Sequence, residues 1–149
     1  MDKKQDISRD EFKKLLKPNA PLIGIDYGAV RIGVAVSDNR RVLASPFKII
    51  GKISELDAIV EERHPCGFVV GMPYTPDGKE GKTAEQVRLF TNRLIEKFGL
   101  PVYFWDERNS SVHVEEKLHS ELKISHKKIK EKLDAVVAAS LLQDVLDTL

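Results

Sequence analysis

The chain has 149 residues, of which 42% are hydrophobic and 32% charged, with a net charge of +1. This composition predicts one soluble globular domain and excludes a disordered chain. No apolar run approaches the roughly 20 residues of a membrane span, and the charged N-terminus lacks the apolar core of a signal peptide. Cys66 is the only cysteine, which excludes an internal disulfide and a cysteine-based zinc cluster. We therefore expect a cytoplasmic protein with no membrane partner.

Residues 1–20 are predicted to form an N-terminal appendage that contains a short helix. Ser8 followed by Glu11 is a capping-box pattern, and the apolar residues after it would give the helix one apolar side. Pro21 then separates this segment from the body of the protein. The sequence thus predicts one domain over residues 21–149.

Three short strands open the body of the protein. The apolar segments 22–26 and 32–37 read as strands, and so does 42–50, although it contains a proline. The connections at 27–31 and 38–41 have the composition of turns. Because such short links join antiparallel neighbours, we expect these three strands to form a meander.

Helices and strands alternate in the next part of the chain. Apolar spacing predicts a helix over 53–60, followed by a buried strand at 67–71. Thr83 and Gln86 form a second capping box, which predicts the start of a helix that ends at a glycine and a proline. The apolar segment 102–105 is then the fifth strand.

Two further helices are predicted towards the C-terminus, a weaker one from about 110 to 118 and a last one whose apolar face begins at Leu133. Strands reached through helices should pair in parallel. The expected fold is therefore α/β: a mixed five-stranded sheet, with three antiparallel strands first and two parallel strands after them, flanked by helices.

Acidic residues fall where functional groups gather in open α/β sheets, at the carboxyl ends of strands. Asp26 ends the first strand, and Asp106 and Glu107 follow the last one. Asp134 lies near the start of an otherwise apolar helix. Each acid also has an ordinary explanation. Asp26 could cap a turn, Asp106 and Glu107 could pair with Arg108, and Asp134 could stabilise a helix N-terminus.

Taken together, these acids point to a metal site. Burying an isolated carboxylate costs several kcal/mol, so each needs a cation or a hydrogen-bond partner. Carboxylate oxygens suit Mg²⁺ or Mn²⁺. A pair of such ions can activate water and stabilise the leaving oxygen of a phosphodiester, so that no nucleophilic side chain is needed.

Four segments resemble the YqgF family of pre-16S rRNA nucleases and Holliday junction resolvase-like proteins: GIDYGAVRIGVAVSD (24–38), FVVGMPYTPDGKEG (68–81), FWDERNSS (104–111) and LDAVVAASLLQDVL (133–146). They occur in the family's order and cover nearly all of the chain beyond the N-terminal segment. The resemblance implies an RNase H-like fold and metal-dependent nuclease chemistry. It also implies that Asp26, Glu107 and Asp134 are the acidic triad that is catalytic and binds the metal.

Several other residues are candidates to contact nucleic acid. Gly28 permits a tight turn and the close approach of a phosphate. Arg31 and Arg108 could grip a phosphate with two hydrogen bonds, although Arg108 could equally be a structural partner of Asp106. Lysines from two segments complete the set, while the alternative for a lysine run is a solvated surface: Lys79, Lys82, Lys127, Lys128 and Lys130.

Other interpretations of the same motifs are weaker. The segment 78–83, GKEGKT, resembles a nucleotide-binding loop, but Pro76 stands where such a loop requires its first glycine. GIDYG also resembles the phosphate-binding hairpin of actin-like ATPases, which need two large domains. A non-catalytic nucleic-acid-binding protein of the same fold is a further alternative, and it would not need Mg²⁺.

The substrate is either structured RNA or branched DNA, since both require phosphodiester hydrolysis in a basic groove. The resemblance favours processing of the 5′ end of pre-16S ribosomal RNA, with a Holliday junction as the second choice. No sequence feature indicates an oligomeric state.

Overall fold

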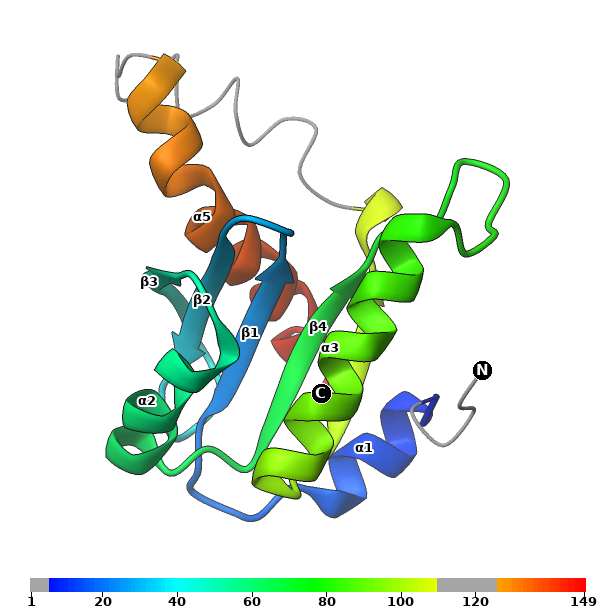
Figure 1. Ribbon diagram of the computed structural model, residues 1–149. Helices are drawn as coiled ribbons and strands as arrows, with labels where there is room; N and C mark the ends of the chain where they lie inside the picture. Colours follow the sequence, from blue (N-terminus) through cyan, green and yellow to red (C-terminus); the bar gives the residue numbers. More distant parts are fainter. Residues whose placement is uncertain (1–5, 110–125) are drawn as a thin grey trace.

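The computed structural model describes residues 6–109 and 126–149, which form one five-stranded sheet in the order β3-β2-β1-β4-β5 (Figure 1). β1 pairs with β2, and β2 with β3, in antiparallel fashion. β4 pairs in parallel with both β1 and β5. This confirms the predicted mixed sheet. The strands are β1 Leu22–Tyr27, β2 Ile32–Ser37, β3 Ala44–Ile50, β4 Gly67–Met72 and β5 Val102–Asp106.

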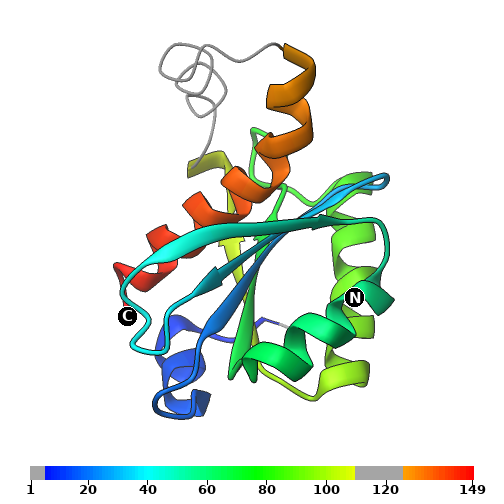
Figure 2. The ribbon, with the colours of Figure 1, turned by 90° about the vertical axis from the view of Figure 1, so that its left-hand side faces the viewer.

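Helices cover both faces of the sheet (Figures 1 and 2). α1 (Arg9–Leu15) and α5 (His126–Leu146) pack on one face, whereas α2 (Leu56–Arg63) and α3 (Lys82–Phe98) pack on the other. Two short 3₁₀ turns, η2 (Ile53–Glu55) and η3 (Glu107–Asn109), precede α2 and follow β5. Among the helices of the described residues, none is long and apolar enough to cross a membrane.

The side chains of strand β1 alternate between the two faces of the sheet. Ile23 and Ile25 point into the core beneath α2 and α3, and Leu22 points into the core beneath α5, as the alternation of strand side chains requires. Gly24 also lies under α5, where an added Cβ would come within 2.8 Å of the carbonyl oxygen of Ala138. The glycine therefore lets α5 approach the sheet closely.

Helix α1 packs against the sheet. The hydroxyl of Ser8 accepts a hydrogen bond from the N–H of Glu11 at 3.1 Å, which is the predicted helix cap. Phe12 is fully buried, and its ring stacks on that of Tyr103 at 5.3 Å between centroids. The Nζ of Lys13 donates to the carbonyl oxygen of Leu149 at 2.8 Å. The N-terminal segment therefore shares the core formed by β5 and α5.

The predicted start of α3, with Thr83 as the helix cap, was wrong. The helix begins at Lys82 with Gly81 as its cap and no side-chain capping bond, so Thr83 is already inside the first turn. The reason is that the carbonyl oxygen of Gly81 accepts the first helical bond, from the N–H of Glu85. The predicted end was right, because Gly99 adopts the left-handed conformation with φ of 63°. The weaker helix expected over 110–118 lies outside the described residues.

Candidate active site

Two carboxylic acids meet at the carboxyl ends of β1 and β5. Asp26 is the last residue but one of β1, Glu107 directly follows β5, and their side chains are hydrogen-bonded. Burial, reinforced by the negative charge of Glu107, raises the pKa of Asp26 to about 8. Burial also raises the pKa of Glu107, but the hydrogen bond from Asp26 opposes that effect. The contact therefore favours one proton held between the two carboxyls over two adjacent negative charges.

A glycine makes this contact feasible. β4 lies between β1 and β5 in the sheet, so Glu107 reaches Asp26 only by crossing over β4. Gly71 lies at the crossing point, where an added Cβ would overlap the Glu107 carboxylate and come within 2.8 Å of its Cγ. Any other residue at this position would push the Glu107 side chain away from Asp26.

A second glycine brings α5 to the same place. Gly33 of β2 is the cross-strand partner of Asp26. An added Cβ on Gly33 would overlap the backbone carbonyl of Asp134 and come within 2.7 Å of the nitrogen of Ala135. Helix α5 is therefore seated against β2 at this level, and the negative charge of Asp134 contributes to the raised pKa of Asp26.

Asp134 forms an ion pair with Arg31, in which Nε and Oδ2 are 3.3 Å apart. Burial raises the pKa of Asp134 and the charge of Arg31 lowers it. Arg31 is the last residue of the turn between β1 and β2. The turn is tight, because an added Cβ on Gly28 would lie 2.6 Å from the carbonyl oxygen of Arg31. The Arg31 side chain is 43% exposed. Its guanidinium can therefore reach a solvent-borne phosphate as well as Asp134.

The structure thus brings Asp26 and Glu107 into contact and leaves Asp134 close by, paired with Arg31. Within the described part of the chain, no three acidic, histidine or cysteine side chains stand close enough together to hold one metal ion. The donor set nevertheless suits a hard divalent cation, since all three groups are carboxyls and two of them share a proton that a cation can replace.

Arg108 takes the structural partner that the sequence offered as its alternative. Its guanidinium donates two hydrogen bonds to the Asp106 carboxylate, at 3.0 and 2.6 Å, and these lower the pKa of Asp106. The same guanidinium lies over the ring of Tyr74, 5.4 Å from its centroid. It also donates to the carbonyl oxygen of Pro76 at 3.4 Å. Arg108 therefore connects η3 to the loop that follows β4.

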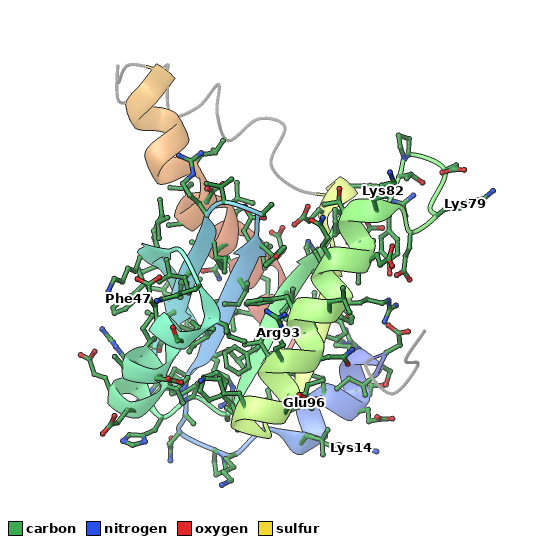
Figure 3. All side chains as sticks on the ribbon, in the orientation of Figure 1. Lys14, Phe47, Lys79, Lys82, Arg93 and Glu96 are labelled. Carbon is green, nitrogen blue, oxygen red and sulfur yellow. The ribbon has the colours of Figure 1, made fainter. Side chains whose placement is uncertain are left out.

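Two of the predicted lysines lie in or directly after the loop 73–81. Figure 3 shows Lys79 at the outer end of the loop and Lys82 where the loop joins α3. The Lys79 side chain is 82% exposed, and its Nζ forms a long ion pair with Asp77, at 3.9 Å. Both lysines are thus available to phosphates near the carboxyl end of the sheet. Lys127, Lys128 and Lys130 lie in the first turns of α5, and their side chains are outside the described part of the structure.

Sequence reasoning missed the residue that anchors this loop. The Arg88 side chain is 9% exposed, and its guanidinium binds Glu80 of the loop at 2.6 Å and Asp6 of the N-terminal segment at 3.0 Å. Its Cζ also lies 5.3 Å from the centroid of the Phe104 ring. No local pattern reveals this role, because Glu80 lies in the loop eight residues before Arg88 and Asp6 is 82 residues away. Gly33 and Gly71 were also missed, and glycine inside an apolar strand was the available signal.

The sheet order and the acids at its carboxyl end define an RNase H-like nuclease fold. In agreement, the structure of T. thermophilus RuvC in complex with a Holliday junction superposes with a TM-score of 0.54. That similarity covers 87% of this chain and 94% of the RuvC chain, at 14% sequence identity, so it establishes the fold. The chain itself belongs to the RuvX family, whose model, described as Holliday junction resolvase, matches residues 20–148.

Curated relatives agree with this assignment, and it confirms the resemblance to the YqgF family. A protein of Cereibacter sphaeroides (strain KD131) named "Putative pre-16S rRNA nuclease" is 40% identical over 146 residues, covering 94% of this chain and 91% of its own. A protein of Phenylobacterium zucineum with the same name is 38% identical, covering 93% and 94%.

Proposed function

We propose that this protein is a divalent-metal-dependent nuclease that hydrolyses phosphodiester bonds and processes the 5′ end of pre-16S ribosomal RNA in the cytoplasm. The observation that carries the proposal is the hydrogen-bonded pair of Asp26 and Glu107. Two buried carboxyls in contact destabilise the fold when both are charged, and a cation relieves that cost. Strongly shifted acids at the end of a sheet mark functional sites.

Each residue of the site has a proposed role. Asp26, Glu107 and Asp134 are the ligands of Mg²⁺ or Mn²⁺, which when bound supplies an activated water and stabilises the leaving oxygen. Asp26 gives up its proton on metal binding and anchors the site from the central strand. Arg31 exchanges Asp134 for a substrate phosphate, since a guanidinium can form paired hydrogen bonds with either anion.

Structured RNA is the proposed substrate. The exposed Lys79 and Lys82 extend the positive charge of Arg31 along the end of the sheet where the acids lie, which suits a phosphate backbone. The name carried by the curated relatives supports RNA over DNA, and the chain matches more than nine-tenths of the length of these relatives.

Cleavage of a Holliday junction is the second candidate. It is favoured by the description of the family model and by the fold shared with a junction-bound RuvC. A non-catalytic nucleic-acid-binding role is the third, and metal dependence separates it from both.

Cleavage of four nucleic acids tests these candidates: structured precursor RNA, single-stranded RNA, a four-way DNA junction and duplex DNA, each with Mg²⁺, Mn²⁺ or EDTA. We expect metal-dependent cleavage of the precursor RNA that Asp26→Asn abolishes. Asp57→Asn is the matched control, because Asp57 lies on α2 in an exposed ion pair with Lys97. Preferred cleavage of the four-way junction would make branched DNA, and not RNA, the substrate of this nuclease. A folded protein that binds RNA but cuts nothing with either metal would overturn the nuclease proposal.

A further inference from the structure

A small cavity opens between the end of β1 and helix α3, next to the acids but on the other face of the sheet. Its volume is about 230 Å³, which is too small for a large ligand and suits a single planar ring system. Both aromatic and polar side chains line it: Tyr27, Ala29, Gln86, Leu89, Phe90 and Arg93.

The cavity occupies the place in the sheet where ligands of α/β proteins bind. The chain turns from β1 towards β2 and from β4 towards α3, so the connections diverge between two parallel neighbours. Such a point leaves a crevice at the carboxyl ends of the strands. Tyr27 directly follows Asp26, and because strand side chains alternate, it faces α3 while Asp26 faces α5. The cavity therefore begins one residue along β1 from Asp26, at the carboxyl end of the strand but on the opposite face of the sheet.

The apolar wall of the cavity is aromatic. The Tyr27 ring packs on that of Phe90, with 4.7 Å between the centroids and 38° between the planes. Leu89 continues this wall and is 58% exposed, so an apolar surface stays open to solvent beside two aromatic rings. Aromatic side chains at such a surface are the usual platform for an unpaired base.

The polar groups come from the same face of α3, since Gln86, Leu89, Phe90 and Arg93 follow helical spacing. Gln86 offers a donor and an acceptor to the edge of a base. Arg93 is exposed and makes no ion pair with any residue in the described part of the chain. Figure 3 shows Arg93 extending from α3 towards β1. Its charge is thus available to a phosphate beside the cavity.

We propose that this cavity binds one unpaired base of the RNA strand that is cleaved. Tyr27 stacks on the base, Gln86 bonds its edge and Arg93 binds an adjacent phosphate. This inference rests on the proposed function and adds a base subsite to it. It implies that the substrate is single-stranded next to the cleaved bond. Because every base has a π-face, the subsite tolerates different bases.

Binding in EDTA tests the subsite without cleavage. The probes are a short single-stranded RNA and inorganic polyphosphate, a polyanion without bases, each measured by competition fluorescence anisotropy. We expect Tyr27→Leu to weaken RNA binding by about 5- to 150-fold, the effect of losing one stacked base. Polyphosphate binding should not change. Tyr27→Phe, which keeps the aromatic ring, should bind RNA about as tightly as the wild type. Arg93→Ala should weaken both probes, whereas Arg40→Ala, the same change of charge in the turn between β2 and β3, should not.

Thermal unfolding of each variant keeps the outcome interpretable. A folded Tyr27→Leu protein that binds RNA as tightly as the wild type overturns the subsite. A loss that is equal for RNA and polyphosphate also overturns it, since the ring would then act through charge or structure. Failure of the nuclease proposal looks different, because Asp26→Asn would leave cleavage unchanged or the wild type would cut nothing, whatever Tyr27 does in EDTA.

Discussion

Gly33 of β2 lies directly against the backbone carbonyl of Asp134, so this glycine sets how closely α5 approaches the sheet. Asp26 is the cross-strand partner of Gly33. The same contact therefore sets the spacing between the two acids. Gly71 of β4, on the other side of β1, acts in a similar way, because the absence of a side chain there leaves room for Glu107 to cross β4. The position of the acids thus depends on the absence of two side chains.

Gly33→Ala should therefore damage both stability and activity. The added methyl group forces α5 away from β2, and overpacking of this kind costs about 1–3 kcal/mol. Metal-dependent cleavage should fall more steeply, since Asp134 moves with the helix. Urea unfolding and RNA cleavage measure the two effects. Gly51→Ala is the control, because its Cβ would meet only the Glu55 carboxylate, at 3.5 Å. Wild-type stability and cleavage in Gly33→Ala would disprove this account.

The shared proton of Asp26 predicts a pH-dependent stability in EDTA. Burial raises the pKa of Asp26 from 3.8 to about 8, so the folded state binds the proton more tightly than the unfolded state. Stability should fall as the pH rises between these two values, by at most about 1.4 kcal/mol per pH unit for one proton. Below pH 4 both states hold the proton, and the contribution is fully present.

Mg²⁺ should reverse this trend, because the cation replaces the proton and stabilises the folded state increasingly towards higher pH. Urea unfolding between about pH 4 and pH 8, with EDTA or Mg²⁺, measures both profiles. Asp26→Asn should flatten the EDTA profile and remove most of the effect of Mg²⁺, whereas Asp57→Asn should keep the wild-type behaviour. Parallel profiles for the wild type and Asp26→Asn would contradict the assignment of the proton.

The sheet was predictable because its signals are local. The apolar segments end at glycines, prolines or charged turns, and the short links at 27–31 and 38–41 require antiparallel neighbours. The rule that functional groups gather at the carboxyl ends of strands placed Asp26 and Glu107 together. Thr83 shows where local signals fail, since the chain around Gly81 starts the helix earlier than the capping pattern indicates.

The contacts around the acids were not predictable, because they join residues that are distant in sequence. Arg31 pairs with Asp134 only after α5 has docked on β2. Nothing near Arg31 in the chain distinguishes a phosphate ligand from a partner of a remote acid. Arg108 is the easier case, because its partner Asp106 is only two residues away in the sequence. Sequence patterns indicate which strand end a residue occupies, but not which charge it meets there.

Arg88 should prove to be the anchor of the loop 73–81. Arg88→Met keeps the apolar stem but leaves Glu80 half-buried without its guanidinium partner, so the unfolding free energy should fall by about 1–3 kcal/mol. The loop should also open more often. Hydrogen exchange at the N–H of Thr75, which donates to the carbonyl oxygen of Lys79 at 2.8 Å, reports that opening.

Arg93→Met is the matched control for Arg88→Met, since Arg93 lies on the same helix but is exposed. Its effect on stability should stay within about 0.5 kcal/mol. Equal effects of the two substitutions, or unchanged exchange at Thr75 in Arg88→Met, would show that the buried ion pairs do not hold the loop.

Phe12 decides whether the N-terminal segment is an appendage or part of the folding unit. Its ring is fully buried between Tyr103 and α5, so Phe12→Ala should lower the unfolding free energy by about 3–5 kcal/mol. Leu15→Ala, on the same helix but with a side chain 54% exposed, should cost less than about 1 kcal/mol.

Urea unfolding followed by tryptophan fluorescence suits this test, because Trp105 lies in the core that Phe12 joins. If α1 were an appendage, it would unfold by itself, and Phe12→Ala would leave the main transition at its wild-type midpoint. A single transition that moves to lower urea would instead make residues 6–20 an integral part of the domain.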